Sequence, residues 1–194
     1  MSEFVIAGAR PWGGEPCDVL VRDGRIAARG KTVDAAPQAR RIDGAGCMLL
    51  PGLIDAHTHL DKTLIGLPWH AHRAGPNLID KITNERAVMA ELGLDPALQS
   101  ARMVRHMLSR GTTAIRSHVD IGLDNKLSHF HGVARTRDAD AALSTIQIVA
   151  FPQTGMLTQP GVTELMEEAV KEGANAVGGL DPIGIDRDPK GQLD

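Results

Sequence analysis

The spacing of hydrophobic and polar positions changes near residue 52. Before that point, short apolar runs such as Phe4–Ala7 alternate with turns, and Asp23-Gly24 is a strong signal for a β-hairpin. No helical period occurs in this part of the sequence. The pattern predicts a small antiparallel β unit over residues 1–51 that ends at Pro51-Gly52.

After residue 52, predicted strands alternate with predicted helices. The apolar stretch Leu53–His57 predicts a buried strand, and β-branched or apolar runs predict three more at 113–119, 145–151 and 174–180. Helical spacing predicts helices over 78–92, from 96 to Gly111, over most of 124–142, and from 162 to Gly173. This alternation is typical of βαβ units that build a parallel sheet.

The motif His57-Thr58-His59, which closes the first of these strands, carries the strongest functional signal. Side chains alternate faces along a strand, so His57 and His59 point the same way. Two neighbouring imidazoles at the carboxyl end of a strand are suited to chelating one divalent metal ion. The alternative is a pair of polar residues that cap the strand through hydrogen bonds to a neighbouring loop.

Two further His-x-His pairs carry weaker signals. His70 and His72 fall in a polar loop, where they either line a site entrance or are solvated, and solvation is the favoured interpretation. His129 and His131 fall in a helical stretch, where positions i and i+2 do not share a face. We therefore expect them at surface or packing positions.

Residues near the ends of these strands are candidates for the same site. His118 shares a strand face with Arg116 and Asp120, which places it either beside the histidine pair or in a buried polar network at the rim of the sheet. Asp61 lies two residues after His59. Either Asp61 orients a metal-binding side chain or the substrate without binding the metal itself, or it forms an exposed ion pair with Lys62.

Gln153 and Asp181 each follow one of the later strands, and each has both a binding and a structural interpretation. Gln153 follows the third strand, and its amide suits recognition of an amide-like or pyrimidine-like edge, although it also suits a turn. Asp181 follows the fourth strand, where capping a turn is the favoured interpretation.

Composition narrows the class of protein. With 42% apolar residues, the 194-residue chain can bury a core. A net charge of -3 without basic clusters disfavours nucleic-acid binding, and no apolar stretch approaches membrane-spanning length. The N-terminus lacks the pattern of a secretory signal, and two cysteines do not make a disulfide scaffold. These features predict a cytoplasmic protein.

Several of these segments resemble the amidohydrolase superfamily. Residues 51–61, Pro-Gly-Leu-Ile-Asp-Ala-His-Thr-His-Leu-Asp, resemble its first barrel strand. Residues 116–120, 147–153 and 177–182 resemble the branch that contains cytosine deaminase and the N-isopropylammelide amidohydrolase-like triazine enzymes.

The resemblance implies an α/β fold, a (β/α)8 TIM barrel with one divalent metal ion, iron or zinc. Residues 1–51 would form part of a small β-sandwich, and residues 52–194 the first four β/α units of the barrel. The metal would be bound by His57 and His59, and would activate water to attack a ring carbon so that ammonia or an amine leaves. The resemblance also matches Gln153 with a substrate-binding amide and Leu78 with a contact to the substrate ring.

The same resemblance places the remaining metal ligands and the general acid and base beyond residue 194, so no catalytic residue is identified. We expect a fragment, inactive alone, of a hydrolytic deaminase that acts on a small pyrimidine-like or triazine-like heterocycle and forms homo-oligomers at full length. One alternative is a related hydrolase that cleaves a cyclic amide. It is disfavoured because no lysine lies in 174–180 to support a two-metal centre. A truncated chain without activity is the other alternative.

Overall fold

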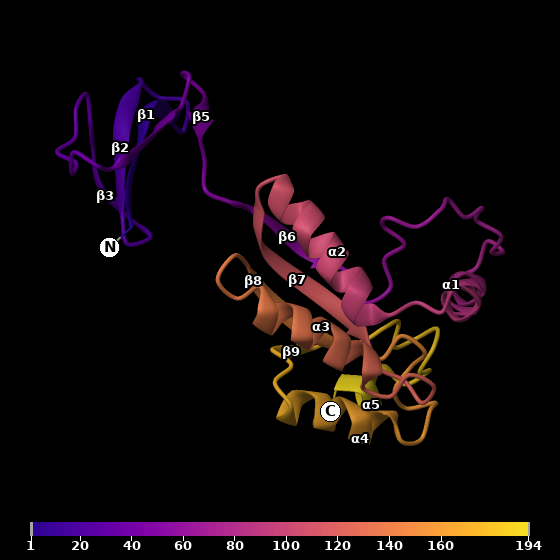
Figure 1. Ribbon diagram of the computed structural model, residues 1–194. Helices are drawn as coiled ribbons and strands as arrows, with labels where there is room; N and C mark the ends of the chain where they lie inside the picture. Colours follow the sequence, from indigo (N-terminus) through magenta and orange to yellow (C-terminus); the bar gives the residue numbers. More distant parts are fainter. Residues whose placement is uncertain (1, 194) are drawn as a thin grey trace. The chain divides into compact units, whose positions relative to one another are not determined.

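The computed structural model describes residues 2–193, and the chain divides into two compact units, residues 1–51 and 52–194 (Figure 1). Each unit is built on its own sheet, of five strands in the first unit and four in the second. None of the helices in the described part of the chain is long and apolar enough to cross a membrane.

The first unit is a mixed sheet with strand order β3-β2-β1-β4, in which β5 also pairs with β1. Its strands are β1 (Glu3–Pro11), β2 (Cys17–Arg22), β3 (Arg25–Gly30), β4 (Arg40–Asp43) and β5 (Met48–Leu49). The hairpin predicted at Asp23-Gly24 is present, and both residues have the positive φ that its tight turn requires. The expectation of a wholly antiparallel unit is wrong, because β4 and β5 both run parallel to β1. The connection after β3 carries the chain to the other side of β1, where β4 pairs with it in parallel instead of forming a hairpin with β3.

The second unit alternates strands and helices, as the hydrophobic pattern predicts. Its strands are β6 (Leu53–Thr58), β7 (Thr112–Asp120), β8 (Thr145–Phe151) and β9 (Ala176–Val177). Its helices are α1 (Leu78–Leu92), α2 (Pro96–Ser109), α3 (Ser128–Ala139), α4 (Val162–Lys171) and α5 (Pro189–Leu193). The strands pair in the order β6-β7-β8-β9, and every pair is parallel. All their carboxyl ends therefore lie at one edge of the sheet.

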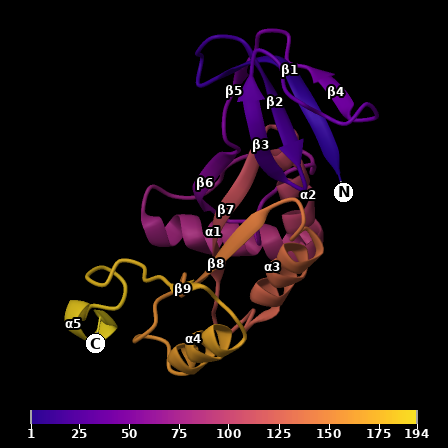
Figure 2. The same ribbon diagram turned by 90° about the vertical axis from the view of Figure 1, so that its left-hand side faces the viewer.

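The hydrophobic core lies between one face of this sheet and the helices α2, α3 and α4 (Figure 2). Ile115 and Val119 of β7 and Ile148 of β8 point into it, and Phe130 of α3 fills its centre. Alternation along β7 places Arg116, His118 and Asp120 on the opposite face of the sheet. One face of the sheet therefore packs against the helices, and the other carries the polar side chains.

Two of the predicted strands differ in the structure. The first, β6, was expected to be buried, but Leu53 is 53% and Ile54 is 74% exposed. The reason is its place at the edge of the sheet, where it pairs only with β7. The fourth, expected over 174–180, shrinks to Ala176–Val177 at the opposite edge, and the glycines that follow weaken a strand there.

Helix boundaries follow local signals. At the start of α2, the Asp95 carboxylate accepts the backbone N–H of Ala97 and of Leu98, with Pro96 at the first position. The helix expected over most of 124–142 begins only at Ser128, because a turn closed between Gly122 and Lys126 occupies the preceding residues.

Asp186 anchors the loop after β8. Its buried carboxylate accepts the backbone N–H groups of Met156 and Leu157 at 2.8 and 3.0 Å, and Gln192 also donates to it. Burial acts to raise the pKa of this carboxyl, but these hydrogen bonds outweigh it and hold the pKa below its usual value. The loop that carries Gln153 is thereby joined to the end of the described chain.

We expect Asp186→Asn to lower the free energy of unfolding at pH 7 by about 1–3 kcal/mol, because charge-assisted hydrogen bonds are lost. A lowered pKa in the folded state gives stability that is present above the unfolded value of 3.8 and is lost as the pH falls through the folded pKa. Below about pH 4, the free energy of unfolding should therefore fall less steeply with decreasing pH in the variant than in the wild type. Urea unfolding at pH 3, 4 and 7 checks this. An equal decrease in the free energy of unfolding between pH 7 and pH 3 in the two proteins would contradict it.

Candidate functional site

Three imidazoles gather where β6 and β7 end. The rings of His57 and His118 are stacked with centroids 4.1 Å apart, and His59 lies 5.9 Å from His57 and 5.8 Å from His118. His57 and His59 are therefore on the same side of their strand, as the His-x-His spacing predicts. The structure also brings His118 into the group, which was one of two interpretations of its position.

Hydrogen bonds to β7 fix the backbone that follows the histidine motif. The hydroxyl of the buried Ser117 accepts the N–H of Leu60 at 3.0 Å, and the Asp61 carboxylate accepts the N–H of Asp120 at 3.1 Å. Leu60 itself is fully buried in the core. The two residues that directly follow His59 are thus anchored to β7.

The surroundings of His59 keep its imidazole neutral. Burial, with the nearby Lys62 ammonium, lowers the pKa of His59 to about 4. Burial is also the largest cause that lowers the pKa of His118, followed by the charge of His57. The Phe151 ring lies steeply inclined to both imidazoles, with centroids 6.0 Å from His59 and 5.5 Å from His118. Neutral imidazole is the form that binds metal ions.

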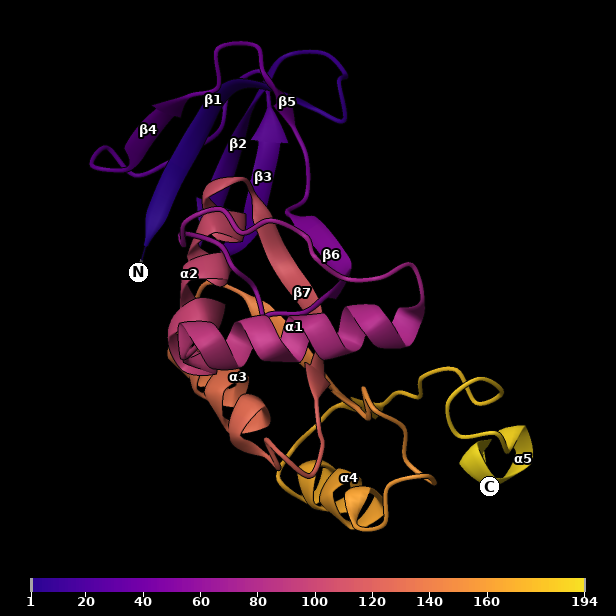
Figure 3. The same cartoon turned by 90° about the vertical axis from the view of Figure 1, so that its right-hand side faces the viewer.

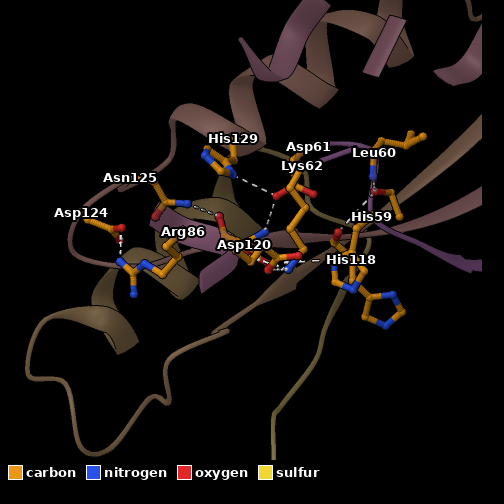
Figure 4. A network of polar contacts seen from close by, with 12 residues as sticks. His59, Leu60, Asp61, Lys62, Arg86, His118, Asp120, Asp124, Asn125 and His129 are labelled. Atoms are coloured by element: carbon orange, nitrogen blue, oxygen red, sulfur yellow. Dashed lines mark hydrogen bonds and ion pairs between the residues drawn. The ribbon is translucent and has the colours of Figure 1, made fainter. Parts of the chain in front are cut away.

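Beside the imidazoles lies a buried charge network, shown in Figure 4. The Lys62 ammonium lies 2.8 Å from a Glu85 oxygen of α1 and 3.1 Å from Oδ2 of Asp120. Both Lys62 and Asp120 are buried. The interpretation of Asp61 and Lys62 as an exposed ion pair is wrong: both side chains are buried, and Lys62 pairs with Asp120 and Glu85 instead.

Burial and the charge of neighbouring groups shift the pKa values of Asp120 and Lys62 in opposite directions. Burial, and then the negative charge of Asp61, raise the pKa of Asp120 to about 7, although Lys62 acts to lower it. For Lys62, burial acts to lower the pKa, but the carboxylates of Asp120 and Glu85 raise it above its usual value. The ammonium therefore stays charged.

Asp61 makes a second buried contact that the sequence does not reveal. Its Oδ2 lies 2.9 Å from Nδ1 of His129 on α3, and its side chain is fully buried. His129 is half-buried at a packing position as expected, whereas His131 is exposed and pairs with Glu172. Because 68 residues separate Asp61 from His129, no local pattern could have linked them.

A cavity of about 260 Å³ opens beside the network, between α1 and the residues that follow β7 and β8. Gln153, Asp120 and His129 line it together with apolar residues such as Met89 of α1 and Leu94, which follows that helix. Figure 3 shows α1 lying crosswise to β7. The structure thus places Gln153 in a partly apolar cavity that is not lined by His57, His59 or His118. Asp120, which lines this cavity, also lies beside the histidine cluster.

The other residues that the sequence singled out lie elsewhere. Leu78 begins α1, is 46% exposed, and is not among the residues that line the cavity with Gln153. Asp181 caps a turn by accepting the N–H of Gly184 at 2.8 Å. Arg116 lies on the polar face of the sheet, where its guanidinium donates to Gln147 at 2.8 and 3.0 Å.

The residues of this cluster fit a divalent metal ion in kind. Imidazole nitrogen is an ordinary ligand for zinc and iron, and Nδ1 of His118 is buried without a hydrogen-bond partner. Within residues 2–193, no group of three or more His, Cys, Asp or Glu side chains is arranged to hold a metal ion. The described chain therefore offers some of the donors for a metal site but not a complete set.

Several known proteins are similar to this chain over nearly its whole length. The uncharacterized protein YahJ of Escherichia coli K12 is 36% identical over 183 residues, which cover 91% of this chain and 39% of YahJ. The structure of N-isopropylammelide isopropylaminohydrolase from Burkholderia multivorans superposes with a TM-score of 0.90 at 42% identity, covering 97% of this chain and 47% of that one. No protein-family model matches the chain.

A 5-methylcytosine deaminase from Klebsiella pneumoniae, solved with 5-fluorocytosine, gives a TM-score of 0.73 at 28% identity and covers 91% of this chain and 43% of that one. The homologues and structural neighbours are amidohydrolase-superfamily members, and they include dihydroorotases. The chain spans less than half the length of the relatives described here.

Proposed function

We propose that this chain, whose homologues and structural neighbours are amidohydrolase-superfamily members, forms the N-terminal half of a metal-dependent hydrolytic deaminase. Its reaction breaks a C–N bond of a pyrimidine-like or triazine-like heterocycle. The observation that carries the proposal is the cluster of His57, His59 and His118 at the carboxyl ends of two adjacent parallel strands.

In this proposal the four parallel strands of residues 52–194 are half of a (β/α)8 barrel, and residues 1–51 are part of a small β-sandwich. The exposed β6 supports the barrel, because an edge strand with apolar residues such as Leu53 and Ile54 is suited to a further neighbour. The polar face of the sheet would line the barrel interior. Further metal ligands and the general acid and base would come from outside the described residues.

His57 and His59 would bind one divalent ion, iron or zinc. Such an ion lowers the pKa of a bound water so that hydroxide is available near neutral pH. The chain's own contribution is to hold two imidazoles on one side of β6 and to keep His59 neutral by burial. The apolar ring of Phe151 packs against His59 and His118.

Gln153 would bind the substrate edge from the end of β8. Its amide both donates and accepts a hydrogen bond, which matches the alternating donors and acceptors of an aminopyrimidine or aminotriazine ring. The cavity it lines, about 260 Å³, suits a small heterocycle. Leu78, at the start of α1, is proposed to contact the ring, which requires the start of α1 to approach Gln153 when substrate is bound.

The test measures ammonia or amine release from cytosine, 5-methylcytosine and N-isopropylammelide in the presence of zinc or ferrous iron. It uses the 194-residue chain and, in parallel, the longest protein product of its gene. We expect turnover by the longer product, lost in His57→Ala, and none by the chain alone. No release from any of these compounds by either protein would rule out the proposal.

Hydrolysis of a cyclic amide is the second candidate, favoured by the dihydroorotases among the relatives. One of them, from Mycobacterium tuberculosis, is 35% identical over 108 residues, 55% of this chain and 25% of that protein. Ring opening of dihydroorotate or hydantoin without ammonia release would support this candidate over deamination.

A further inference from the structure

Two buried polar atoms near the proposed metal site face each other without a partner. Nδ1 of His59 and Oδ1 of Asp120 are both buried and both lack a hydrogen bond, and they lie 3.9 Å apart. Among residues 2–193, Asp120 is the carboxylate that pairs with His59. Leaving both groups unsatisfied costs free energy, so a small movement that joins them is favourable.

The rest of Asp120 is held in place. Its Oδ2 is bound by the Lys62 ammonium at 3.1 Å, and its backbone N–H is bound by Asp61 at 3.1 Å. Lys62 is itself fixed by Glu85 of α1 at 2.8 Å. Only Oδ1 remains free, on the side that faces His59.

We propose that Asp120 is a positioning residue, which accepts a hydrogen bond from Nδ1–H of His59 when His59 binds the metal, and that Lys62 holds the carboxylate in that orientation. The inference rests on the proposed function, because it requires His59 to be a metal ligand. Closing the gap from 3.9 Å to about 2.8 Å gives a charge-assisted hydrogen bond.

This hydrogen bond would select the tautomer of His59. A proton fixed on Nδ1 leaves the lone pair of Nε2 free for the metal, and a carboxylate partner strengthens imidazole as a ligand. It would also connect the site with α1, through His59, Asp120, Lys62 and Glu85 in turn. Lys62 and Asp120, in the middle of this series, are buried, whereas His59 and Glu85 at its two ends are partly exposed.

The test compares the 194-residue chain with Asp120→Ala and Asp120→Asn. We measure the binding of Co²⁺ and Zn²⁺ by calorimetry, and the Nδ1 proton and ring nitrogens of His59 by NMR of the ¹⁵N-histidine-labelled, zinc-loaded chain. Asp138→Ala is the matched control, because Asp138 is an exposed carboxylate that pairs with the neighbouring Arg137. Lys62→Met is included because it leaves Asp120 in place but removes its support.

We expect metal affinity to fall about 10- to 100-fold in Asp120→Ala, less in Asp120→Asn and Lys62→Met, and not at all in the control. In the wild-type chain the Nδ1 proton of His59 should resonate far downfield, and in Asp120→Asn it should move upfield because an amide is a weaker acceptor. If Asp120→Ala does not fold, as judged by circular dichroism, the proton shift in Asp120→Asn decides.

The inference is overturned if the His59 Nδ1 resonance is unchanged in Asp120→Asn, even where affinity falls, because a merely structural effect would not involve this proton. The variant His59→Ala distinguishes failure of this inference from failure of the proposed function. If His59→Ala binds metal like the wild type, the proposed metal site is wrong. If His59→Ala loses affinity while the Asp120 variants keep theirs, only the role of Asp120 is wrong.

Discussion

Replacing His59 with alanine is expected to weaken the binding of Zn²⁺ to this chain by more than about 100-fold. Removing a residue that hydrogen-bonds a metal ligand lowers metal affinity by about 10- to 100-fold, and removing the ligand itself lowers it further. The effect is large here because the chain offers few donors, with no group of three or more ligand side chains arranged around a metal position in residues 2–193. Calorimetric titration of the metal-free protein at pH 7.5 measures it.

The control is His131→Ala. This exposed imidazole on α3 pairs with Glu172 at 2.7 Å and lies on a different element from the cluster. Its removal should leave Zn²⁺ affinity unchanged, whereas His57→Ala should resemble His59→Ala. Equal loss of affinity in the His131 and His59 variants would show that zinc binds the surface histidines nonspecifically, and would contradict the site.

Phe130→Ala should destabilise the second unit by about 3–5 kcal/mol. Phe130 is 1% exposed, and its ring fills the core between α3 and the sheet, so truncation leaves a cavity that close-packed neighbours cannot fill. The loss is a large fraction of the stability of an ordinary domain, about 5–15 kcal/mol. Urea unfolding followed at 222 nm reports on this unit, because every helix in the described part of the chain belongs to it.

Leu143→Ala is the comparison for this measurement. Leu143 is 63% exposed before β8, and its truncation should change the free energy of unfolding by less than about 0.5 kcal/mol. A loss of under about 1 kcal/mol in Phe130→Ala would contradict the assignment of this residue to the centre of the core.

The two predictions concern opposite faces of one sheet. Along β7, residues at alternate positions either pack against the helices or carry the polar groups of the site, so Val119 stabilises the strand that presents His118 and Asp120. A substitution on the helix face is therefore expected to act on the site only through loss of folding. This separation makes the stability and metal-binding measurements independent tests.

Local sequence determined much of this protein. Alternation of strands and helices predicted the parallel sheet, Asp95-Pro96 predicted the start of α2, and the spacing of His57 and His59 placed both imidazoles on one side of β6. These features depend on backbone periodicity and on capping groups within a few residues, and both can be seen in the sequence.

Tertiary structure alone decided the rest. It brought His118 against His57, joined Asp61 to His129 across 68 residues, and buried Lys62 between Asp120 and Glu85. It also left β6 exposed at the edge of the sheet, although its apolar sequence predicted burial. Burial and long-range pairing depend on which elements pack together, and the free energy that governs packing is summed over residues far apart in the chain.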